Sequence, residues 1–402
     1  MRLNVEKIRK EFPLFGNGEK GGVVYFDNAC MTLRPRCVIE AVRQYYELFP
    51  SCGERSMHRL GKRVDAEVAR SRSIARKFFG AKRNEEIIFT SGTTHAINIV
   101  AHSFPFKKGD VVVTTDKEHN SNLLVWQQLA KKGVVRHVAV PFGDVEALSR
   151  VLEKGRVGLV SMVYTSNADG SSIPVKDVIR AAHKHGVPVL LDGAQAAPHR
   201  RVDVRALDVD FFACSGHKML GPSGTGLLYG KKAWLERLVP ALVGGGTVVD
   251  ATLQGAEFEE LPHRFEAGLQ NYAGIIGLGA AMEFLLSVGL SRIHDHEVAL
   301  TQRLEEGLRE FSHRGVRVIG PSPKERGGVT SFFVEGVDVH QVALLLDESG
   351  GFATRSGRHC VHAWFNKQQL DGTVRVSFYL YNTMEEVESF LEALRSVLEI
   401  VA

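Results

Sequence analysis

Short apolar, β-branched runs alternate with longer segments of helical period between about residues 85 and 230. The runs predict strands at 87–89, 111–113, 157–161, 187–191, 209–213 and 227–229. Helices are predicted at 94–101 and 120–131, and Pro174 is well placed to begin another. Alternation of this kind is typical of βαβ units, in which helices cover both faces of a mostly parallel sheet. The pattern therefore predicts an α/β fold.

The pattern changes after Gly246. Two strongly helical segments are predicted at 274–288 and 292–311, followed by short strands at 329–334 and 374–378 and helices at 339–346 and 384–398. This second region indicates a smaller α/β domain. We expect a large domain of residues 20–265 and a small domain of residues 1–19 and 266–402, with the boundary on the helical region at 272–311.

The composition narrows the class of partner. The 402 residues include 50 Lys and Arg against 46 Asp and Glu, which gives a formal net charge of +4. Because this excess is small and no basic block is interleaved with aromatic residues, we expect no nucleic-acid partner and no anionic membrane partner. Hydrophobic residues at 44% and charged residues at 24% are typical of a globular protein and exclude a disordered chain.

The cysteines and the amino terminus indicate the cellular compartment of the protein. Five cysteines without a CxxC pair fit neither a disulfide framework nor a zinc ribbon, so we expect a reducing, cytoplasmic location. The charged amino terminus lacks the apolar core of a signal peptide. The apolar stretch 272–290 is interrupted by Glu283, which favours a buried helix over a membrane span. His294 and His296 are two apart on a predicted helix, so we expect no metal site.

Polar side chains follow four of the predicted strands at the point where each strand ends. These segments are Thr90–Thr94, Glu118–Asn120, Asp192–Gln195 and Ser215–Lys218. In open α/β sheets, ligands bind outside the carboxyl ends of the strands. We therefore expect the four segments to meet around one ligand.

Pyridoxal phosphate is the ligand that would require all four groups together. A helix start with Thr93 and Thr94 suits a phosphate, and Ser215 and His217 are close enough to add contacts. Three further residues complete the set: Asp192 would pair with the ring nitrogen, His119 would stack on the ring, and Lys218 would form a Schiff base.

Each of these residues also has an ordinary structural explanation. Asp192 alone could cap a helix, Lys218 alone could be a solvated lysine, and the threonines could be caps. The cofactor interpretation is favoured because four independent strand ends supply compatible groups.

The cysteines differ in their surroundings. Cys30, Cys37 and Cys214 fall in apolar segments and are interpreted as inert core thiols, and Cys52 receives no role. Cys360 follows Arg355-Ser-Gly-Arg-His359 in a loop bounded by glycine, where cationic neighbours favour a reactive thiolate. The alternative for Cys360 is an exposed loop cysteine without a role.

Over nearly its whole length the sequence resembles the class V aminotransferases, a family of fold type I pyridoxal phosphate enzymes. Within the family it is most similar to SufS-type cysteine desulfurases and selenocysteine lyases. The motifs that carry the resemblance are Tyr25-Phe-Asp-Asn-Ala29, Ser91-Gly-Thr-Thr94, Glu118-His119, Ser166-Asn167, Asp192-Gly-Ala-Gln195, Ser215-Gly-His-Lys218, Arg264-Phe-Glu-Ala-Gly268, Arg355-Ser-Gly-Arg-His-Cys360 and Arg375–Asn382. The resemblance implies a seven-stranded type of sheet in the large domain and a smaller α/β carboxyl-terminal domain.

The resemblance also implies a role for individual residues. Lys218 would carry the cofactor and remove the substrate Cα proton, with Asp192 and Gln195 on the ring nitrogen and the ring hydroxyl oxygen. Asn167 would lie beside the ring near His119, and Thr94, Ser215 and His217, with Thr93, would hold the phosphate. Arg375, with Arg355 near it, would bind the substrate carboxylate, for which a guanidinium is suited. Cys360 would take sulfur from L-cysteine as a persulfide and release alanine.

Three interpretations stay open at this point. The leading one is a cysteine desulfurase that acts as a homodimer, passes sulfur to an acceptor protein and serves iron–sulfur cluster assembly. The second is another class V enzyme, such as a selenocysteine lyase or an aminotransferase, and the third is a non-catalytic cofactor-binding partner in sulfur transfer. The intact Lys218, Asp192 and Arg375 argue against the third.

The sequence departs from the family pattern at three places. The usual Ala-x-Pro after the reactive cysteine is replaced by Val361-His-Ala-Trp-Phe365, and a second histidine after His119 is replaced by Asn120. Leu269 stands where the family has a threonine that bonds the phosphate in the neighbouring subunit. We therefore expect the phosphate to be held mainly within one subunit.

Overall fold

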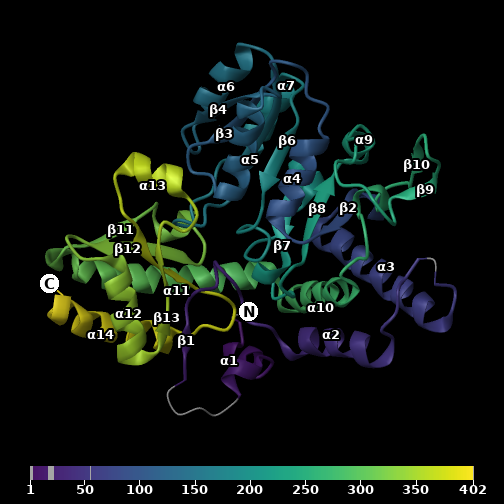
Figure 1. The fold of residues 1–402 in the computed structure, drawn as a ribbon. Helices are drawn as coiled ribbons and strands as arrows, with labels where there is room; N and C mark the ends of the chain where they lie inside the picture. The colour runs from purple at the N-terminus through teal and green to yellow at the C-terminus, as the bar shows by residue number, and fades with distance from the viewer. Residues whose placement is uncertain (1–2, 17–21, 55, 402) are drawn as a thin grey trace.

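The computed structural model describes residues 3–16, 22–54 and 56–401. A seven-stranded sheet forms its centre, in the order β2-β8-β7-β6-β5-β3-β4 (Figure 1). The strands are β2 (Ile87–Thr90), β3 (Val111–Thr115), β4 (Arg136–Val140), β5 (Val157–Val163), β6 (Val189–Asp192), β7 (Phe211–Ser215) and β8 (Gly226–Gly230). Only β8 runs antiparallel to its two neighbours, so the prediction of a mainly parallel sheet is confirmed.

Helices cover both faces of this sheet because its central strands are mostly apolar and almost every residue in them is buried. Alternate residues of a strand point to opposite faces. Ile87 and Phe89 accordingly pack in one core cluster, and Ile88 packs in another. The first cluster includes α3 (Arg59–Phe79), α6 (Val145–Glu153), α7 (Val175–Lys184) and α10 (Tyr272–Val288). The second includes α4 (Thr93–Ser103) and α5 (Asn120–Lys131).

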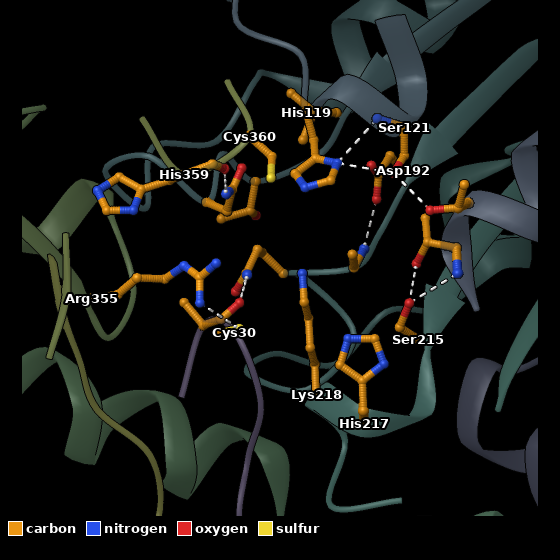
Figure 2. A pocket seen from close by; sticks show the side chains of 18 of the residues that line it. Cys30, His119, Ser121, Asp192, Ser215, His217, Lys218, Arg355, His359 and Cys360 are labelled. Carbon is orange, nitrogen blue, oxygen red and sulfur yellow. Dashed lines mark hydrogen bonds between the residues drawn. The ribbon is translucent and has the colours of Figure 1, made fainter. Parts of the chain in front are cut away.

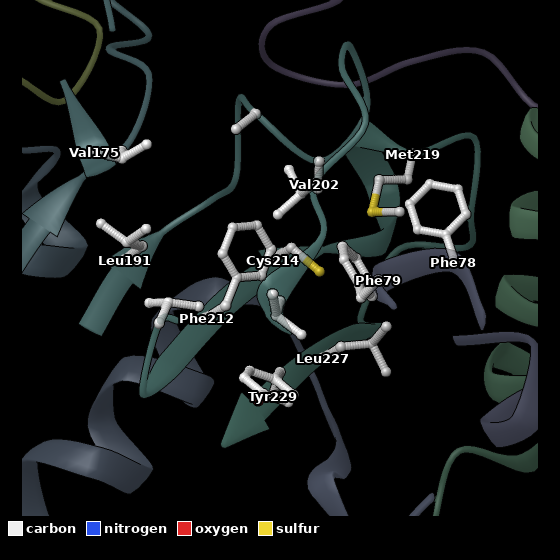
Figure 3. Close-up of a cluster of buried hydrophobic side chains, with 14 of the residues drawn as sticks. Phe78, Phe79, Val175, Leu191, Val202, Phe212, Cys214, Met219, Leu227 and Tyr229 are labelled. Carbon is white, nitrogen blue, oxygen red and sulfur yellow. The ribbon is translucent and has the colours of Figure 1, made fainter. Parts of the chain in front are cut away.

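The first cluster is a dense aromatic and aliphatic core (Figure 3). Phe212 of β7 and Phe79 of α3 lie with their ring centroids 5.4 Å apart. Cys214 is buried beside them, and burial raises the pKa of its thiol far above the usual range. The interpretation of Cys214 as an inert core thiol is confirmed.

A four-stranded antiparallel sheet forms a second centre, in the order β11-β12-β15-β14. Its strands are β11 (Val316–Ile319), β12 (Val329–Val334), β14 (Arg355–Gly357) and β15 (Thr373–Ser377). Its core cluster includes residues of α11 (Leu290–Glu310), α12 (Val339–Gly350) and α14 (Met384–Val401). Two separate strands, β1 (Val24–Tyr25) and β13 (Phe352–Ala353), pair in parallel beside it.

The amino-terminal segment packs against residues from the end of the chain. Arg9 at the end of α1 (Val5–Arg9) donates to Glu386 at 2.6 Å, and Phe12 packs on Tyr381. Asp27 forms a bridge with Ser377 of the second sheet. The expected division at residues 19 and 20 falls within 17–21, outside the described residues, and the two-domain division stays a prediction.

The remaining elements are short or peripheral. They are α2 (Arg36–Leu48), α8 (Val204–Leu207), α9 (Lys232–Leu235), α13 (His362–Gln368), the hairpin strands β9 (Val248–Ala251) and β10 (Ala256–Phe258), and 3₁₀ turns at Pro13–Phe15, Asn84–Glu86, Gly216–Lys218, His263–Phe265, Ser312–Arg314 and Pro323–Glu325. The hairpin stands away from the body of the molecule (Figure 1).

The apolar stretch 272–290 forms the helix that the sequence predicted. Most of α10 is buried, and it contacts α2 and α3. Within the described part of the chain, no single helix is both long and apolar enough to cross a membrane. Only α10 and α11 taken together meet those criteria, as a pair bent by 74°.

Candidate active site

A cavity of about 220 Å³ lies where strands of the large sheet end and the second sheet approaches. It is lined by every residue that the sequence singled out for the site: Thr93, Thr94, His119, Asn167, Asp192, Gln195, Ser215, His217, Lys218, Arg355, Cys360 and Arg375. Figure 2 shows the side chains of 18 of the residues that line this cavity.

One end of the cavity is formed by hydroxyls at the start of α4. The Thr93 backbone N–H donates to Ser215 Oγ at 2.9 Å, and the two hydroxyl oxygens lie 2.7 Å apart. Thr94 Oγ1 lies 2.7 Å from Ser121 Oγ. The first backbone N–H groups of a helix have no partner within it, and they favour an anion. A phosphate is the anion that this cluster of hydroxyls and N–H groups suits.

Asp192 and Gln195 follow β6 and face the same cavity. Asp192 Oδ1 accepts from the Ala194 backbone N–H at 2.9 Å, and burial raises the pKa of the carboxyl, opposed by Ala194 and Lys218. Gln195 Nε2 donates to the Ala29 carbonyl at 2.6 Å. Its buried Oε1 has no hydrogen-bond partner among the described residues. A ligand that brings a hydrogen-bond donor to Oε1 would remove the energetic cost of burying this acceptor without a partner.

His119 is half-buried at the amino end of α5, where its side chain caps the helix. Nδ1 accepts from the Ser121 backbone N–H at 3.1 Å, so Nδ1 carries no proton and Nε2 does. Burial, assisted by the positive charges of Lys218 and Arg375, lowers the pKa of His119 to about 3. The imidazole is therefore neutral at ordinary pH, which suits stacking on an aromatic ring.

Lys218 ends the 3₁₀ turn Gly216–Lys218 that follows β7. Burial lowers the pKa of its amine, Asp192 opposes that shift, and Arg375 adds to it. A thiolate at Cys30 or Cys360 would raise the pKa of this amine, as Asp192 does. A lowered pKa increases the fraction of neutral amine, which is the form that attacks a carbonyl or accepts a proton.

The second sheet contributes two arginines. Arg355 of β14 and Arg375 of β15 are direct neighbours in the antiparallel register. Arg375 is buried, and it donates to the Asn167 carbonyl at 3.0 Å and to Asp27 Oδ1 at 3.1 Å. Its Nε has no hydrogen-bond partner among the described residues. A carboxylate entering the cavity would be attracted by the positive charge of this guanidinium, which lines it.

Cys360 lies between β14 and α13 on a loop that hydrogen bonds fix from two sides. The Asn120 backbone N–H donates to the Cys360 carbonyl at 2.7 Å, and Asn167 Nδ2 donates to the His359 carbonyl at 2.6 Å. His359 and Cys360 both have left-handed φ angles, 49° and 58°. Such angles are uncommon for residues other than glycine, so these bonds stabilise an otherwise unfavourable turn that directs the thiol toward the cavity.

Two departures from the family pattern meet at this loop. Asn120 Nδ2 lies 3.0 Å from Nδ1 of His362, two residues after Cys360. Trp364 of α13 lies against Lys117, whose ammonium is 4.6 Å from the ring centroid. Asn120 and His362, which both replace residues of the usual pattern, therefore contact each other beside the loop of Cys360.

The sequence interpretation missed several residues of the cavity: Ala29, Cys30, Ser121, Val163, Thr165, Ala194 and His359. The interpretation of Cys30 as a core thiol is wrong, because Cys30 is half-buried and faces the cavity. Cys37 is exposed, so its assignment to the core is also wrong. The position of Cys30 next to Asp27 and Ala29, in a motif already singled out, was the available signal.

No group of three or more histidine, cysteine or acidic residues that could hold a metal ion occurs in residues 3–16, 22–54 and 56–401.

Comparison with known proteins identifies the family. The sequence model of the aminotransferase class-V family matches residues 24–390. The chain belongs to this family. This class-V protein is 39% identical to a probable cysteine desulfurase of Halalkalibacterium halodurans over 99% of the chain and 98% of the relative. It is 34% identical to a cysteine desulfurase of Haloferax volcanii over 100% of the chain and 98% of the relative.

Solved structures of similar proteins share the fold of this class-V protein. A cysteine desulfurase from Thermococcus onnurineus NA1 superposes with a TM-score of 0.93 at 38% identity, covering 99% of both chains. A cysteine desulfurase from Escherichia coli gives a TM-score of 0.91 at 31% identity and covers both chains fully. A more distant cystine C–S lyase, 22% identical, shares the fold with a TM-score of 0.82.

Proposed function

We propose that the protein is a pyridoxal-phosphate-dependent cysteine desulfurase, which converts L-cysteine into alanine and leaves the sulfur on Cys360 as a persulfide. The observation that carries the proposal is that Cys360, Lys218, Asp192 and Arg375 line one cavity. The relatives named as cysteine desulfurases support it over the full length of the chain.

The residues present fit the cofactor. Asp192 suits the ring nitrogen, because a buried carboxylate gains from a cationic N–H, and Gln195 Oε1 can accept from the ring hydroxyl. Thr93, Thr94, Ser215 and His217 surround the place suited to the phosphate. Neutral His119 can lie on the ring, with Asn167 beside it. When bound, pyridoxal phosphate supplies an electron sink for the charge that develops on the substrate's Cα.

The arginines bind and orient the substrate. Arg375 presents an unused Nε, and its other two nitrogens are fixed by Asn167 and Asp27. Because the side chain is already held in place, binding a carboxylate costs little additional ordering. Arg355 lies opposite it in the register and can add a second guanidinium.

Lys218 and Cys360 perform the chemistry of this chain. Lys218 accepts the proton from Cα, because its lowered pKa keeps a fraction of the amine neutral. The Cys360 thiolate attacks the substrate's sulfur, so that an S–S bond forms as the Cβ–S bond breaks. The carbon keeps the electron pair of that bond, takes a proton and leaves as alanine.

We further propose that the protein functions as a homodimer. Apolar side chains are exposed over the segment that contains the β9–β10 hairpin, among them Val239, Leu242, Val243, Val249, Leu253, Phe258 and Leu269. Leu253 is fully exposed and Leu269 is 76% exposed. Many exposed apolar side chains on one segment are typical of a protein–protein interface, and a second copy of the chain is the partner that the family resemblance implies.

We also propose a reducing, cytoplasmic setting and a sulfur-acceptor protein, with iron–sulfur cluster assembly as the use of the sulfur. All five cysteines are free, and persulfide formation requires Cys360 to stay free. A persulfide is a stored, transferable sulfur atom, so turnover requires an acceptor thiol.

The proposed function is tested by supplying L-cysteine to the purified holoenzyme and measuring alanine and sulfide. We expect equal amounts of alanine and sulfide in the presence of a reducing thiol. Cys360→Ala should abolish both while the bound cofactor keeps its absorbance, because Cys360 is not among the proposed cofactor ligands. Full desulfurase activity in Cys360→Ala would contradict the proposal and favour another class V activity. Cleavage of selenocysteine by that variant would not contradict the proposal, because selenium is a better leaving group and needs less help from a thiolate.

A further inference from the structure

Cys30 is a second thiol in the cavity that the proposed reaction does not use. It follows β1 in a loop that carries Asp27, and its half-buried side chain lines the same cavity as Cys360. Arg355 Nη1 donates to Cys30 Sγ at 3.1 Å. The guanidinium that is proposed to assist with the substrate carboxylate therefore also contacts a sulfur atom of the protein.

Cys30 belongs to the half of the cavity where sulfur is handled. Figure 2 shows Arg355, Cys30 and Cys360 on one side of Lys218, with Asp192 and Ser215 on the other. A thiolate on either cysteine would raise the pKa of the Lys218 amine. Two thiols from segments far apart in the sequence thus lie near one amine.

The surroundings of the two thiols suit an anionic sulfur. Arg355 contacts Cys30 directly, and it precedes Cys360 by five residues on the same segment. The buried guanidinium of Arg375 lines the same cavity. Hydrogen bonds from charged donors stabilise anions more strongly than bonds from neutral donors do. The two guanidinium groups therefore favour an anionic persulfide in this half of the cavity.

We propose that Cys30 is a second sulfur-carrying thiol, which accepts the outer sulfur of the Cys360 persulfide. This inference rests on the proposed function. The Cys30 thiolate attacks the outer sulfur, forming a new S–S bond while the bond to Cys360 Sγ breaks. Cys360 leaves with the electron pair as a thiolate, so the exchange requires no oxidant or reductant.

The transfer changes how much sulfur one chain can hold. Because Cys360 becomes a free thiolate again, it can take sulfur from another substrate molecule while Cys30 still carries the first sulfur. A chain without an acceptor protein should therefore store two sulfur atoms.

The test uses the holoenzyme with L-cysteine and without reductant or acceptor. After a short reaction, all thiols and persulfides are alkylated at mildly acidic pH, which slows exchange, and tryptic peptides are analysed by mass. The peptides of Cys30 and Cys360 separate because arginines lie between them. We expect both peptides to carry one additional sulfur atom, with the Cys360 peptide labelled first.

Three variants make the test specific. Cys30→Ser should halve the protein-bound sulfur, and Cys360→Ala should leave the Cys30 peptide unlabelled, because its sulfur comes through Cys360. Cys37→Ser is the matched control, since that thiol is exposed and does not line the cavity, and it should keep the full amount of bound sulfur.

The outcomes separate this inference from the proposed function. Alanine and a labelled Cys360 peptide without label on Cys30 would overturn only the inference. A Cys30–Cys360 disulfide formed with release of sulfide would overturn it too, because Cys30 would then have attacked the inner sulfur. Absence of both alanine and label at Cys360 would overturn the proposed function itself.

Discussion

Individual residues of the cavity combine burial with an unused hydrogen-bonding capacity. Gln195 Oε1 and Arg375 Nε are both buried without a partner in the described part of the chain. Folded proteins leave few such groups, since each costs about 1–3 kcal/mol. Such groups lower the stability of the protein without ligand. A cofactor or substrate that forms hydrogen bonds with them would regain that free energy.

Lys218 provides the most direct prediction at this scale. Treating the holoenzyme with borohydride should link the cofactor irreversibly to Lys218, because its partly neutral amine forms the Schiff base. Peptide mapping should find the label on that lysine alone. Lys117, another buried lysine, is occupied by an ion pair with Asp169 and serves as the internal control. Label on Lys117 or any other lysine would contradict the assignment.

Glu118 leads to a prediction about pH. Its buried carboxylate accepts hydrogen bonds from Thr115, Asn122 and Val163, yet burial raises the pKa of the carboxyl from 4.5 to about 7. A raised pKa in the folded state means that Glu118 contributes stability below pH 4.5, which is lost as the pH rises through 7.

The measurement compares urea unfolding of the apo form of the native chain and of Glu118→Gln across that range. Between about pH 5 and 8, the native chain should lose roughly 2–3 kcal/mol of unfolding free energy relative to the variant. Glu118→Gln itself should be less stable at low pH, because its amide would face the Asn122 amide. A difference between the two proteins that does not change with pH would refute the raised pKa.

At the scale of elements, the site depends on how α5 is fixed to the sheet. Asn122 of α5 is fully buried, and its Nδ2 donates to Glu118 at 2.7 Å. Its Oδ1 accepts from Trp126 at 3.1 Å and from Ser161 of β5 at 2.5 Å. The amide of Asn122 thus joins α5, which His119 caps, to β5.

Asn122→Ala should consequently destabilise the protein by about 3 kcal/mol or more, because it leaves three buried polar groups without partners. Urea unfolding measures the change. Leu124→Ala is the matched control on the same helix, because Leu124 is exposed and should change stability by less than about 0.5 kcal/mol. Equal losses in the two variants would show that the amide does not fix the helix.

The second sheet determines where the thiol and the arginines lie. Arg355 and Arg375 face each other across one strand pair, and Cys360 follows Arg355 on the same segment. A shift in register between β14 and β15 would therefore displace Arg355 and the thiol relative to Arg375.

For the whole molecule, the main question is how two copies share the site. Leu269 is exposed and lies next to Ser91 and His95, in a cavity of about 190 Å³ close to the start of α4. If the chain forms the proposed dimer, Leu269 offers the partner's phosphate no hydrogen-bond donor. We expect the phosphate to be held mainly by Thr94, Ser215 and His217 of the same subunit.

Leu269→Thr should then tighten binding of pyridoxal phosphate by about tenfold, the effect of one added hydrogen bond to a charged group. Titration of the cofactor into the apo form measures the affinity, and sedimentation velocity establishes that the protein is a dimer. Leu253→Thr is the control, since it changes another exposed leucine, on the hairpin, and should leave cofactor affinity unaltered. Unchanged affinity in Leu269→Thr would mean that residue 269 does not face the phosphate.

The local pattern of the sequence determined most elements of the large sheet. The strands at 87–90 and 157–163 and the helix Asn120–Lys131 follow the predictions closely, because long apolar runs and strong helical periods act locally. The strand Arg136–Val140 was not predicted, since it lies at the edge of the sheet and only Val140 among its residues is fully buried. The hairpin of β9 and β10 was missed because its side chains are mostly exposed and its sequence lacks a buried face.

The sequence by itself also determined the residues expected to hold the cofactor, because they follow predicted strands and the carboxyl ends of parallel strands meet at one edge. Only the tertiary structure decided the position of Cys30. Its neighbours in the sequence are apolar, and the thiol reaches the cavity through the packing of the amino-terminal segment on the second sheet. The turn at His359 and Cys360 likewise depends on bonds from Asn120 and Asn167, which are distant in sequence. The local pattern of residues predicts helices and strands, which depend on nearby residues. The contacts of Cys30, His359 and Cys360 form only when the two sheets pack against each other.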